Sequence, residues 1–238
     1  MTQVSAYTRP RSLDEANEAL RRPGAVLIGG GTKLSRRGAE ARVEVVDLQA
    51  LGFDDIERGA GATLRMGATV TLQEVVDHAG APDVVREAAR REQPSTLRNQ
   101  ATVGGCVATG DPESELLAAL LAYGAVVTFA DGAPVPLEDV LASLPLGPDA
   151  IVTAVTIETE GRAAAERAAR TTADSPIVAA VARSAGGALR LAMSGVADRP
   201  VLVTRIDELR PPGDFRGSGE YRAAVAAVLA ARVEEAVR

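Results

Sequence analysis

The sequence predicts an α+β protein, with two units that mix helices and strands followed by a small sheet closed by a helix. Three observations predict this class. Ser12 and Thr71 each begin a capping box directly before a stretch with helical periodicity. Short apolar or alternating runs separate the helical stretches, as strands do. After residue 170, three strand-like runs follow one another before a last helical segment. We therefore divide the chain into units at 1–52, 53–165 and 171–238.

The first unit is predicted to contain one helix and two strands. Leu13, Ala16 and Leu20 share one face of a helix that Pro23-Gly24 ends. An apolar run then leads into three consecutive glycines, and a second strand follows. The expected elements are a helix at 13–22 and strands at 25–28 and 43–48.

The second unit contains the best-marked helix of the chain. Four leucines between residues 116 and 121 form its buried stripe, and Gly124 ends it. Asp111 is the expected N-cap, with Pro112 at the first helical position. The other expected elements of this unit are strands at 64–70, 125–130 and 151–157 and helices at 72–79, 83–91 and 137–144.

The third unit is predicted as a small sheet covered by a helix. Gly186-Gly187 is a two-residue turn typical of a β-hairpin, so the strands on either side should pair. The expected elements are strands at 176–183, 188–193 and 200–205 and a helix at 219–237.

Composition excludes several classes of function. The formal net charge is −6 and the charges are interspersed, so we expect no nucleic-acid partner. The longest apolar run, 116–130, is shorter than the roughly 20 residues that span a bilayer, so no membrane span is expected. Cys106 and His78, the single cysteine and histidine, cannot form an iron–sulfur or zinc site from this chain alone. The N-terminus resembles no export signal, so we expect a cytoplasmic protein.

Two glycine-rich loops are the candidate binding features. Residues 29–32 read Gly-Gly-Gly-Thr after a predicted strand, so their amides can face an anion without a Cβ in the way. A tight turn is the alternative interpretation of such a cluster. The second loop, 101–109, places a Gly-Gly pair among small and hydroxylated residues, with exposed amides and the Thr102 hydroxyl. Two such loops in one chain favour a phosphate ligand.

Neither loop contains the dinucleotide fingerprint G-x-G-x-x-G or the Gly-Lys-Ser/Thr of a P-loop. The loops instead resemble the FAD-binding medium subunit of the molybdenum hydroxylases, the xanthine dehydrogenase and aerobic carbon monoxide dehydrogenase family. In that family an Ala-Gly-Gly-Thr-Asp-Leu loop binds the FAD pyrophosphate, and residues 29–34 are similar, with Lys33 in place of the acid. The second signature, Arg-Asn-x-Ala-Thr-Val-Gly-Gly-Asn and then Ser-Pro-x-Ser-Asp-Leu, resembles residues 98–106 and 111–116.

The resemblance implies a two-part FAD-binding domain of the PCMH type, the vanillyl-alcohol oxidase-like fold, followed by a small flavoprotein C-terminal domain. It implies FAD as the cofactor and no catalytic side chain of the chain's own, because the redox chemistry belongs to the flavin. By the same resemblance, the residues expected to hold FAD are Leu27, Ile28, Gly29, Gly30, Gly31, Thr32, Lys33, Leu34, Thr102, Val103, Gly104, Gly105, Cys106, Ala108, Glu115, Ile151 and Arg167.

Four of these positions carry specific expectations. Lys33 either neutralises a phosphate charge or extends into solvent. Cys106, in place of an asparagine, is either a reactive thiol with a lowered pKa, able to link the flavin covalently, or a small apolar filler. Glu115 keeps a carboxylate where the family has an aspartate that contacts the ribityl and adenosine side of the flavin. Arg167 either reaches the flavin or forms a surface ion pair with an acid nearby in the sequence.

The resemblance implies an electron-transfer subunit. In that family, electrons pass from a molybdopterin-binding large subunit through a [2Fe–2S] small subunit to FAD, and then to NAD or another acceptor. Two alternatives stay open: a stand-alone flavoprotein oxidoreductase, and a scaffold that keeps the fold but has lost FAD. The departures at Lys33, Cys106 and Glu115 favour the scaffold, whereas the intact glycines of both loops argue against it.

Overall fold

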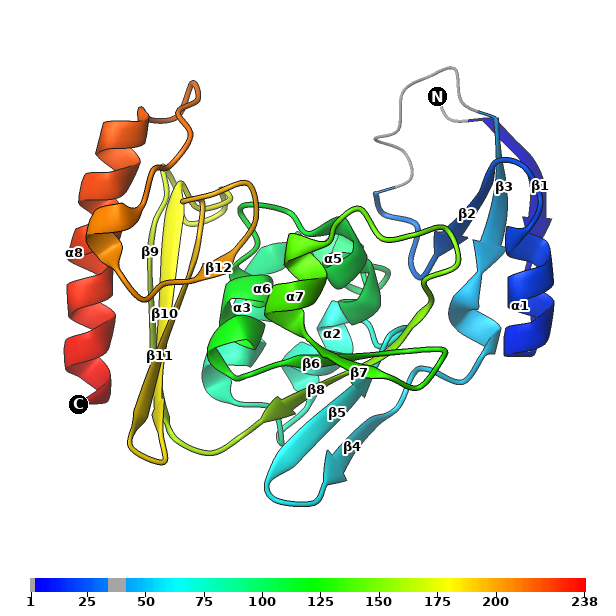
Figure 1. Ribbon diagram of the computed structural model, residues 1–238, viewed down its shortest axis with the longest axis horizontal. Helices are drawn as coiled ribbons and strands as arrows, with labels where there is room; N and C mark the ends of the chain where they lie inside the picture. The colour runs from blue at the N-terminus through cyan, green and yellow to red at the C-terminus, as the bar shows by residue number, and fades with distance from the viewer. Residues whose placement is uncertain (1–2, 34–41) are drawn as a thin grey trace.

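Three sheets follow one another through the molecule in chain order, from the N-terminal unit to the C-terminal helix (Figure 1). The computed structural model describes residues 3–33 and 42–238. Helices cover the sheets and fill the space between the second and the third, so the predicted α+β class is confirmed. Within the described residues, no helix is both long enough and apolar enough to cross a membrane.

The N-terminal sheet is parallel, with the strand order β1-β3-β2. The Ser12 hydroxyl accepts a hydrogen bond from the Glu15 amide at 3.2 Å, as the capping box predicts. The sequence does not indicate β1, since most of its side chains are exposed and no apolar alternation marks it. The elements of this unit are β1 (Gln3–Thr8), α1 (Leu13–Leu20), β2 (Ala25–Ile28), β3 (Arg42–Asp47) and a 3₁₀ turn at Leu48–Ala50.

The middle sheet is antiparallel, in the order β4-β5-β8-β6-β7. Its strands are β4 (Ile56–Gly59), β5 (Thr63–Gly67), β6 (Val126–Phe129), β7 (Pro134–Pro136) and β8 (Val152–Glu158). Its helices are α2 (Leu72–Asp77), α3 (Asp83–Glu92), α4 (Ser95–Arg98), α5 (Val103–Thr109), α6 (Glu115–Ala122) and α7 (Leu137–Ala142). The sequence analysis does not predict β4, β7, α4 or α5, which are short and carry no clear periodicity.

The helix α6 runs through the centre of the molecule, and all of its residues are buried. The predicted N-cap was wrong, because Ser114 caps the helix by accepting a hydrogen bond from the Leu117 amide at 3.0 Å. Asp111 instead closes the turn before the helix, where its carboxylate accepts the Glu113 amide at 3.2 Å. Pro112 therefore lies in that turn rather than in the helix.

The third sheet is antiparallel, in the order β12-β11-β10-β9. Gly186 and Gly187 both have positive φ and form the predicted two-residue turn between β10 and β11. The unpredicted strand β9 pairs with β10, so this sheet begins before the expected start of the third unit at 171. Its elements are β9 (Arg162–Ala168), β10 (Val178–Ala185), β11 (Ala188–Ser194), β12 (Val201–Leu202), a 3₁₀ turn at Ile206–Glu208 and α8 (Gly219–Val237).

The third sheet lies between two layers of helix, with α8 on one face and α6 on the other (Figure 1). Arg222 of α8 is 3% exposed and ties this unit together from inside. Its Nη1 donates hydrogen bonds to the carbonyl oxygens of Ile177, at 2.6 Å, and Gly195, at 3.0 Å. Its Nη2 forms an ion pair with Asp214 at 2.7 Å. A buried charge with these partners is costly to remove.

We predict that Arg222→Ala lowers the free energy of unfolding by about 3 kcal/mol, because two buried carbonyls and a carboxylate lose their donor. Chemical denaturation followed by circular dichroism measures the change. The matched control is Arg232→Ala, at an exposed position of the same helix. Equal stability of the two variants would contradict the prediction.

Candidate functional site

The first glycine loop and α5 enclose a cavity of about 180 Å³. The loop begins where β2 ends, and the C-terminus of α3 closes another side. The two segments that the sequence analysis singled out therefore meet at one site. Most of the predicted residues line this cavity, namely Leu27, Ile28, Gly29, Gly30, Gly31, Thr32, Lys33, Thr102, Gly105, Cys106 and Ala108.

The two segments pack so closely that only glycine fits at the contact. A Cβ on Gly30 would lie 1.4 Å from the carbonyl oxygen of Gln100, and a Cβ on Gly29 would lie 2.5 Å from Oγ1 of Thr102. Both distances are far below van der Waals contact, so a side chain at either position would displace the loop. Gly31 is required for a different reason, because its φ of +69° lies in the left-handed region.

The first glycine loop provides free backbone donors. In the part of the chain that the structure describes, the amides of residues 30–33 donate no hydrogen bond. The carbonyl oxygen of Gly29, by contrast, accepts a hydrogen bond from the side-chain amide of Gln49 at 3.0 Å. Consecutive unpaired amides beside a cavity form an anion-binding arrangement. The loop can therefore offer these amides to an anion, and the expectation that it does so stays a prediction.

The second segment, 101–109, is the helix α5 with its N-cap and not a loop. Thr102 is its N-cap, and Oγ1 accepts the Gly105 amide at 3.1 Å. The amides of residues 103 and 104 donate to carbonyl oxygens in the segment after β5, both at 2.9 Å. The prediction of exposed amides here was wrong, because the chain itself uses them. Gly104 instead permits close packing, since a Cβ there would lie 2.8 Å from Ala68.

A smaller hollow of about 80 Å³ adjoins the contact between Gly29 and Thr102. Thr69 lines this hollow, and its buried Oγ1 has no hydrogen-bond partner among the described residues. An unsatisfied buried hydroxyl costs about 1–3 kcal/mol. Sequence reasoning missed Thr69, because a single threonine after a strand-like run carries no signal of its own.

The cavity adjoins a second one of about 700 Å³, which is bordered by α3, the turn before α6 and the connection between β9 and β10. Lys33, Glu92, Gln93 and Asp111 line both cavities. At this junction Nζ of Lys33 lies 3.0 Å from Oδ2 of Asp111. Lys33 is therefore paired at the rim of the site and does not extend freely into solvent.

Glu92 is a carboxyl group held inside the site. Its Oε2 accepts hydrogen bonds from the Ser114 hydroxyl at 2.9 Å and from the Leu116 amide at 3.2 Å, so it satisfies the N-terminus of α6. Burial raises the pKa of Glu92 to about 7, and the two hydrogen bonds oppose this rise only in part. The site thus contains a carboxyl group that titrates near neutral pH.

Cys106 lines the cavity without being activated. Burial, together with the charge of Glu92, raises the pKa of the Cys106 thiol well above its usual value, and Lys33 opposes this only in part. The interpretation of Cys106 as a thiol with a lowered pKa was therefore wrong. A thiol in this state is a weak nucleophile, and the role of an apolar filler fits it.

Glu115 and Arg167 form an ion pair between two units. Glu115 is the first residue of α6, and its Oε1 lies 3.0 Å from Nε of Arg167 on β9. Burial raises the pKa of Glu115, while Arg167 is the strongest opposing influence. Arg167 also donates to the carbonyl oxygens of Thr172, at 3.2 Å, and Asp174. Arg167 therefore pairs across units and not on the surface with an acid nearby in the sequence.

The remaining predicted residues lie around the cavity rather than in its wall. Glu115 borders the wider cavity, and Arg167 is connected to it through Glu115. Val103 and Ile151 belong to the hydrophobic core, and Gly104 lines only the small hollow. Leu34 lies outside the described residues.

Sequence reasoning missed several residues that complete the wall. Glu92 and Gln93 come from the end of α3, whose charged sequence is typical of a surface helix. Thr109 ends α5, and Asp111 was expected only as a helix cap. The one feature of the sequence that could have indicated these residues is that they lie close to the second signature.

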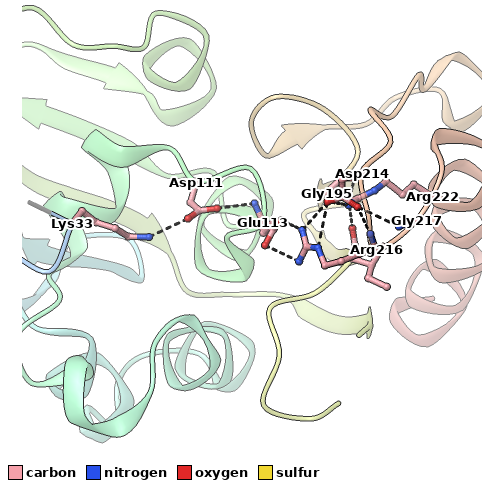
Figure 2. A network of polar contacts seen from close by, with 9 residues as sticks. Lys33, Asp111, Glu113, Gly195, Asp214, Arg216, Gly217 and Arg222 are labelled. Atoms are coloured by element: carbon pink, nitrogen blue, oxygen red, sulfur yellow. Dashed lines mark hydrogen bonds and ion pairs between the residues drawn. The ribbon is translucent and has the colours of Figure 1, made fainter. Parts of the chain in front are cut away.

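A chain of polar contacts links the site to the C-terminal unit (Figure 2). Lys33 pairs with Asp111, whose Oδ1 accepts the Glu113 amide. The Glu113 carboxylate accepts a hydrogen bond from Nη1 of Arg216 at 3.0 Å, and Arg216 pairs with Asp214 at 3.2 Å. Asp214 in turn pairs with the buried arginine of α8. Ion pairs and one backbone hydrogen bond thus connect the glycine loop with the last helix.

Comparison with known proteins identifies relatives of this chain. The family model described as the FAD binding domain in molybdopterin dehydrogenase matches residues 2–158, which include both glycine-rich segments. Uncharacterized protein YgfM of Escherichia coli strain K12 is 32% identical over 248 residues, which cover 96% of this chain and 94% of that protein.

Several solved structures share the fold over the whole chain. The cyanide-inactivated Cu,Mo-CO dehydrogenase has a TM-score of 0.85 at 23% identity, and the match covers 100% of this chain and 98% of that one. The reconstituted CO dehydrogenase from Oligotropha carboxidovorans has a TM-score of 0.85 at 24% identity, with the same coverage. Quinoline 2-oxidoreductase from Pseudomonas putida 86 has a TM-score of 0.83 at 23% identity, covering 98% and 96%.

We predict that Gly30→Ala lowers the free energy of unfolding by about 1–3 kcal/mol, because the new methyl group collides with the Gln100 carbonyl and the loop must move. Urea denaturation measures the change. Gly147→Ala is the matched control, since nothing lies within 4 Å of a Cβ at that position. If both variants were equally stable, the loop contact would not constrain the fold.

Proposed function

The chain belongs to the family of FAD-binding domains of molybdopterin dehydrogenases, and on this premise we propose that it is the flavin subunit of an oxidoreductase complex. In this proposal FAD receives electrons from a [2Fe–2S] small subunit, which takes them from a molybdopterin-binding large subunit. The electrons then leave FAD for NAD or another external acceptor. The solved structures with this fold that are named carbon monoxide dehydrogenase and quinoline 2-oxidoreductase support the direction of the proposal.

One observation carries the proposal: both signature segments meet at a single cavity with free donors. The first segment contributes the amides of residues 30–33, which have no acceptor among the residues that the structure describes. The second segment contributes the Thr102 hydroxyl and, through its packing, holds the first loop in place. Lys33 adds a cation at the rim. A pyrophosphate needs such a set of donors.

Three features of the site fit a dinucleotide. The cavities of about 180 and 700 Å³ share a border, and small-molecule sites typically measure roughly 300–1,000 Å³. The free amides suit the charged middle of the cofactor. The partnerless hydroxyl of Thr69 suits a polar group of a ligand beside the loops. The two carboxyl groups of Glu92 and Asp111 are the features that oppose an anion.

FAD supplies the redox chemistry when it is bound. The chain supplies position: the loop amides and Lys33 hold the pyrophosphate, and the contact between Gly30 and Gln100 keeps the loop closed on it. The pair of Glu115 and Arg167 fixes the border between the wider cavity and the third sheet. In this role no side chain of the site needs to act as a catalytic acid or base.

We predict that the purified chain binds FAD and that Lys33→Gln raises the dissociation constant about tenfold. The variant loses a charge-assisted contact to phosphate and leaves the Asp111 carboxylate unpaired beside it. Titration with FAD, followed by visible absorbance and flavin fluorescence, measures the affinity. Arg21→Gln is the matched control, because it removes one positive charge from an exposed position of the same unit.

Three outcomes would contradict this proposal in whole or in part. A chain that stays colourless with excess FAD would support a scaffold of this fold that has lost its cofactor. Equal affinity of Lys33→Gln and the unchanged chain would remove Lys33 from the site. In the third outcome, the FAD-loaded chain oxidises a substrate of its own and reduces an acceptor without the two proposed partner subunits. That result would instead indicate a stand-alone flavoprotein oxidoreductase.

A further inference from the structure

We propose that FAD binding by this chain takes up one proton and that the carboxyl group of Glu92 holds it. The inference rests on the proposed function and adds a residue that the resemblance does not assign. The carboxyl group of Glu92 would differ in its protonation state before and after an anionic ligand enters the cavity. The proton comes from solvent and ends on an oxygen of Glu92.

The hydrogen bonds of Glu92 use one of its two carboxylate oxygens and leave the other without a partner. Oε2 is occupied by the Ser114 hydroxyl and the Leu116 amide. Oε1 has no hydrogen-bond partner among the described residues. This atom is not fully buried. Since Glu92 lines both cavities, Oε1 is open to whatever fills them. A proton on Oε1 would make this atom a hydrogen-bond donor.

The charges of the site favour a proton on Glu92 once an anion is bound. A pyrophosphate diester carries two negative charges, and the wall of the inner cavity contains two carboxyl groups and one cation. The cation, Lys33, is already paired with Asp111 at 3.0 Å. An ionised Glu92 would therefore face the anion without a compensating charge. Protonation removes that repulsion and supplies a donor to a phosphate oxygen.

Glu92 is the carboxyl group of the inner cavity that has no charged partner. Asp111 pairs with Lys33 through one oxygen and accepts the Glu113 amide on the other. Glu92 contacts only neutral donors, and burial raises its pKa to about 7. Cys106 does not compete, since the pKa of its thiol is raised well above the usual value.

Other charged side chains surround the wider cavity and set the background field. Arg91 of α3 and Arg167 of β9 both pair with Glu115, and Arg216 pairs with Glu113, so each of these arginines already has an acidic partner. The residues of the β9–β10 connection that line the cavity are uncharged. The charged groups of its wall are Lys33 from the first glycine loop, Glu87, Arg90, Arg91 and Glu92 from α3, Arg98 from α4, Asp111 and Glu113 from the turn, and Glu115 from α6.

The direction of the pH dependence follows from linkage. Below about pH 6 Glu92 is already protonated in the free chain, so binding takes up no proton and the affinity for FAD is constant. Above about pH 7 the free chain has lost the proton and the complex regains it. The dissociation constant should then rise with pH, up to about tenfold per pH unit while one proton is taken up.

Isothermal titration calorimetry of the full chain with FAD tests this directly. Titrations near pH 8 in two buffers of different ionisation enthalpy give the number of protons taken up, which should approach one. Titrations near pH 6 should give a number close to zero. The uptake is measured on the unchanged chain and does not depend on any variant.

The variant Glu92→Gln assigns the proton. An amide keeps an acceptor for Ser114 and Leu116 and cannot titrate, so the affinity for FAD should become independent of pH between about pH 6 and about pH 9. Near pH 8 the variant should bind FAD about tenfold more tightly than the unchanged chain. The matched control is Glu138→Gln, an exposed position on α7 outside these cavities, which should keep the pH dependence.

The outcomes separate this inference from the proposed function. Binding of FAD without proton uptake, or with uptake that persists in Glu92→Gln, would overturn the role of Glu92 and leave the flavin proposal standing. Absence of FAD binding at every pH, in the unchanged chain and in the variant, would overturn both. Proton uptake that is lost in Glu92→Gln and kept in Glu138→Gln would establish the inference.

Discussion

The close contact between the first glycine loop and the segment before α5 is the constraint on which the site depends. Gly30 lies against the Gln100 carbonyl and Gly29 against the Thr102 hydroxyl, with no room for a Cβ at either position. The loop makes this contact with its glycine backbone alone. No side chain of the loop can change rotamer to loosen it, so the contact fixes the N-terminal unit to the middle unit. Beside this contact, the amides of residues 30–33 donate no hydrogen bond to any residue in the described ranges. The site therefore results from the packing of two units, and neither unit contains it alone.

The N-terminus of α6 is a second junction, and it joins the middle unit to the third. A helix buried along its whole length cannot leave its first amides to water, so these amides need partners from the protein. Glu92 of α3 provides one partner, and Ser114 provides another. Glu115, at the same end, pairs with Arg167 of β9. The requirement to satisfy one buried helix end thus brings α3, α6 and the third sheet to the edge of the cavity.

The sequence predicts those parts of the fold whose causes are local. The capping box at Thr71 and the turn at Gly186-Gly187 form as expected, because each joins residues a few positions apart. The strand β9 has an alanine-rich sequence without β-branched residues, and its conformation depends on pairing with β10. In α5 two glycines disfavour a helix locally, but close packing on the segment after β5 requires one of them, Gly104. The glycine-rich segments of the site could be predicted, because their residues are adjacent in the sequence. The burial of Glu92 could not, because it depends on packing against residues distant in the sequence.

Two departures from the family signature form an ion pair. Lys33 stands where the signature it resembles has an acid, Asp111 stands where that signature has a serine, and the two side chains pair. At these two positions the signature has one negative charge, whereas the pair of Lys33 and Asp111 has none, so the charge beside the glycine loop is more positive by one. That change favours an anion at the loop amides. The loop glycines are in place, and Lys33 has a partner. Random loss in a disused site would have no reason to supply Lys33 with that partner, so the pair argues against a scaffold that has lost its cofactor.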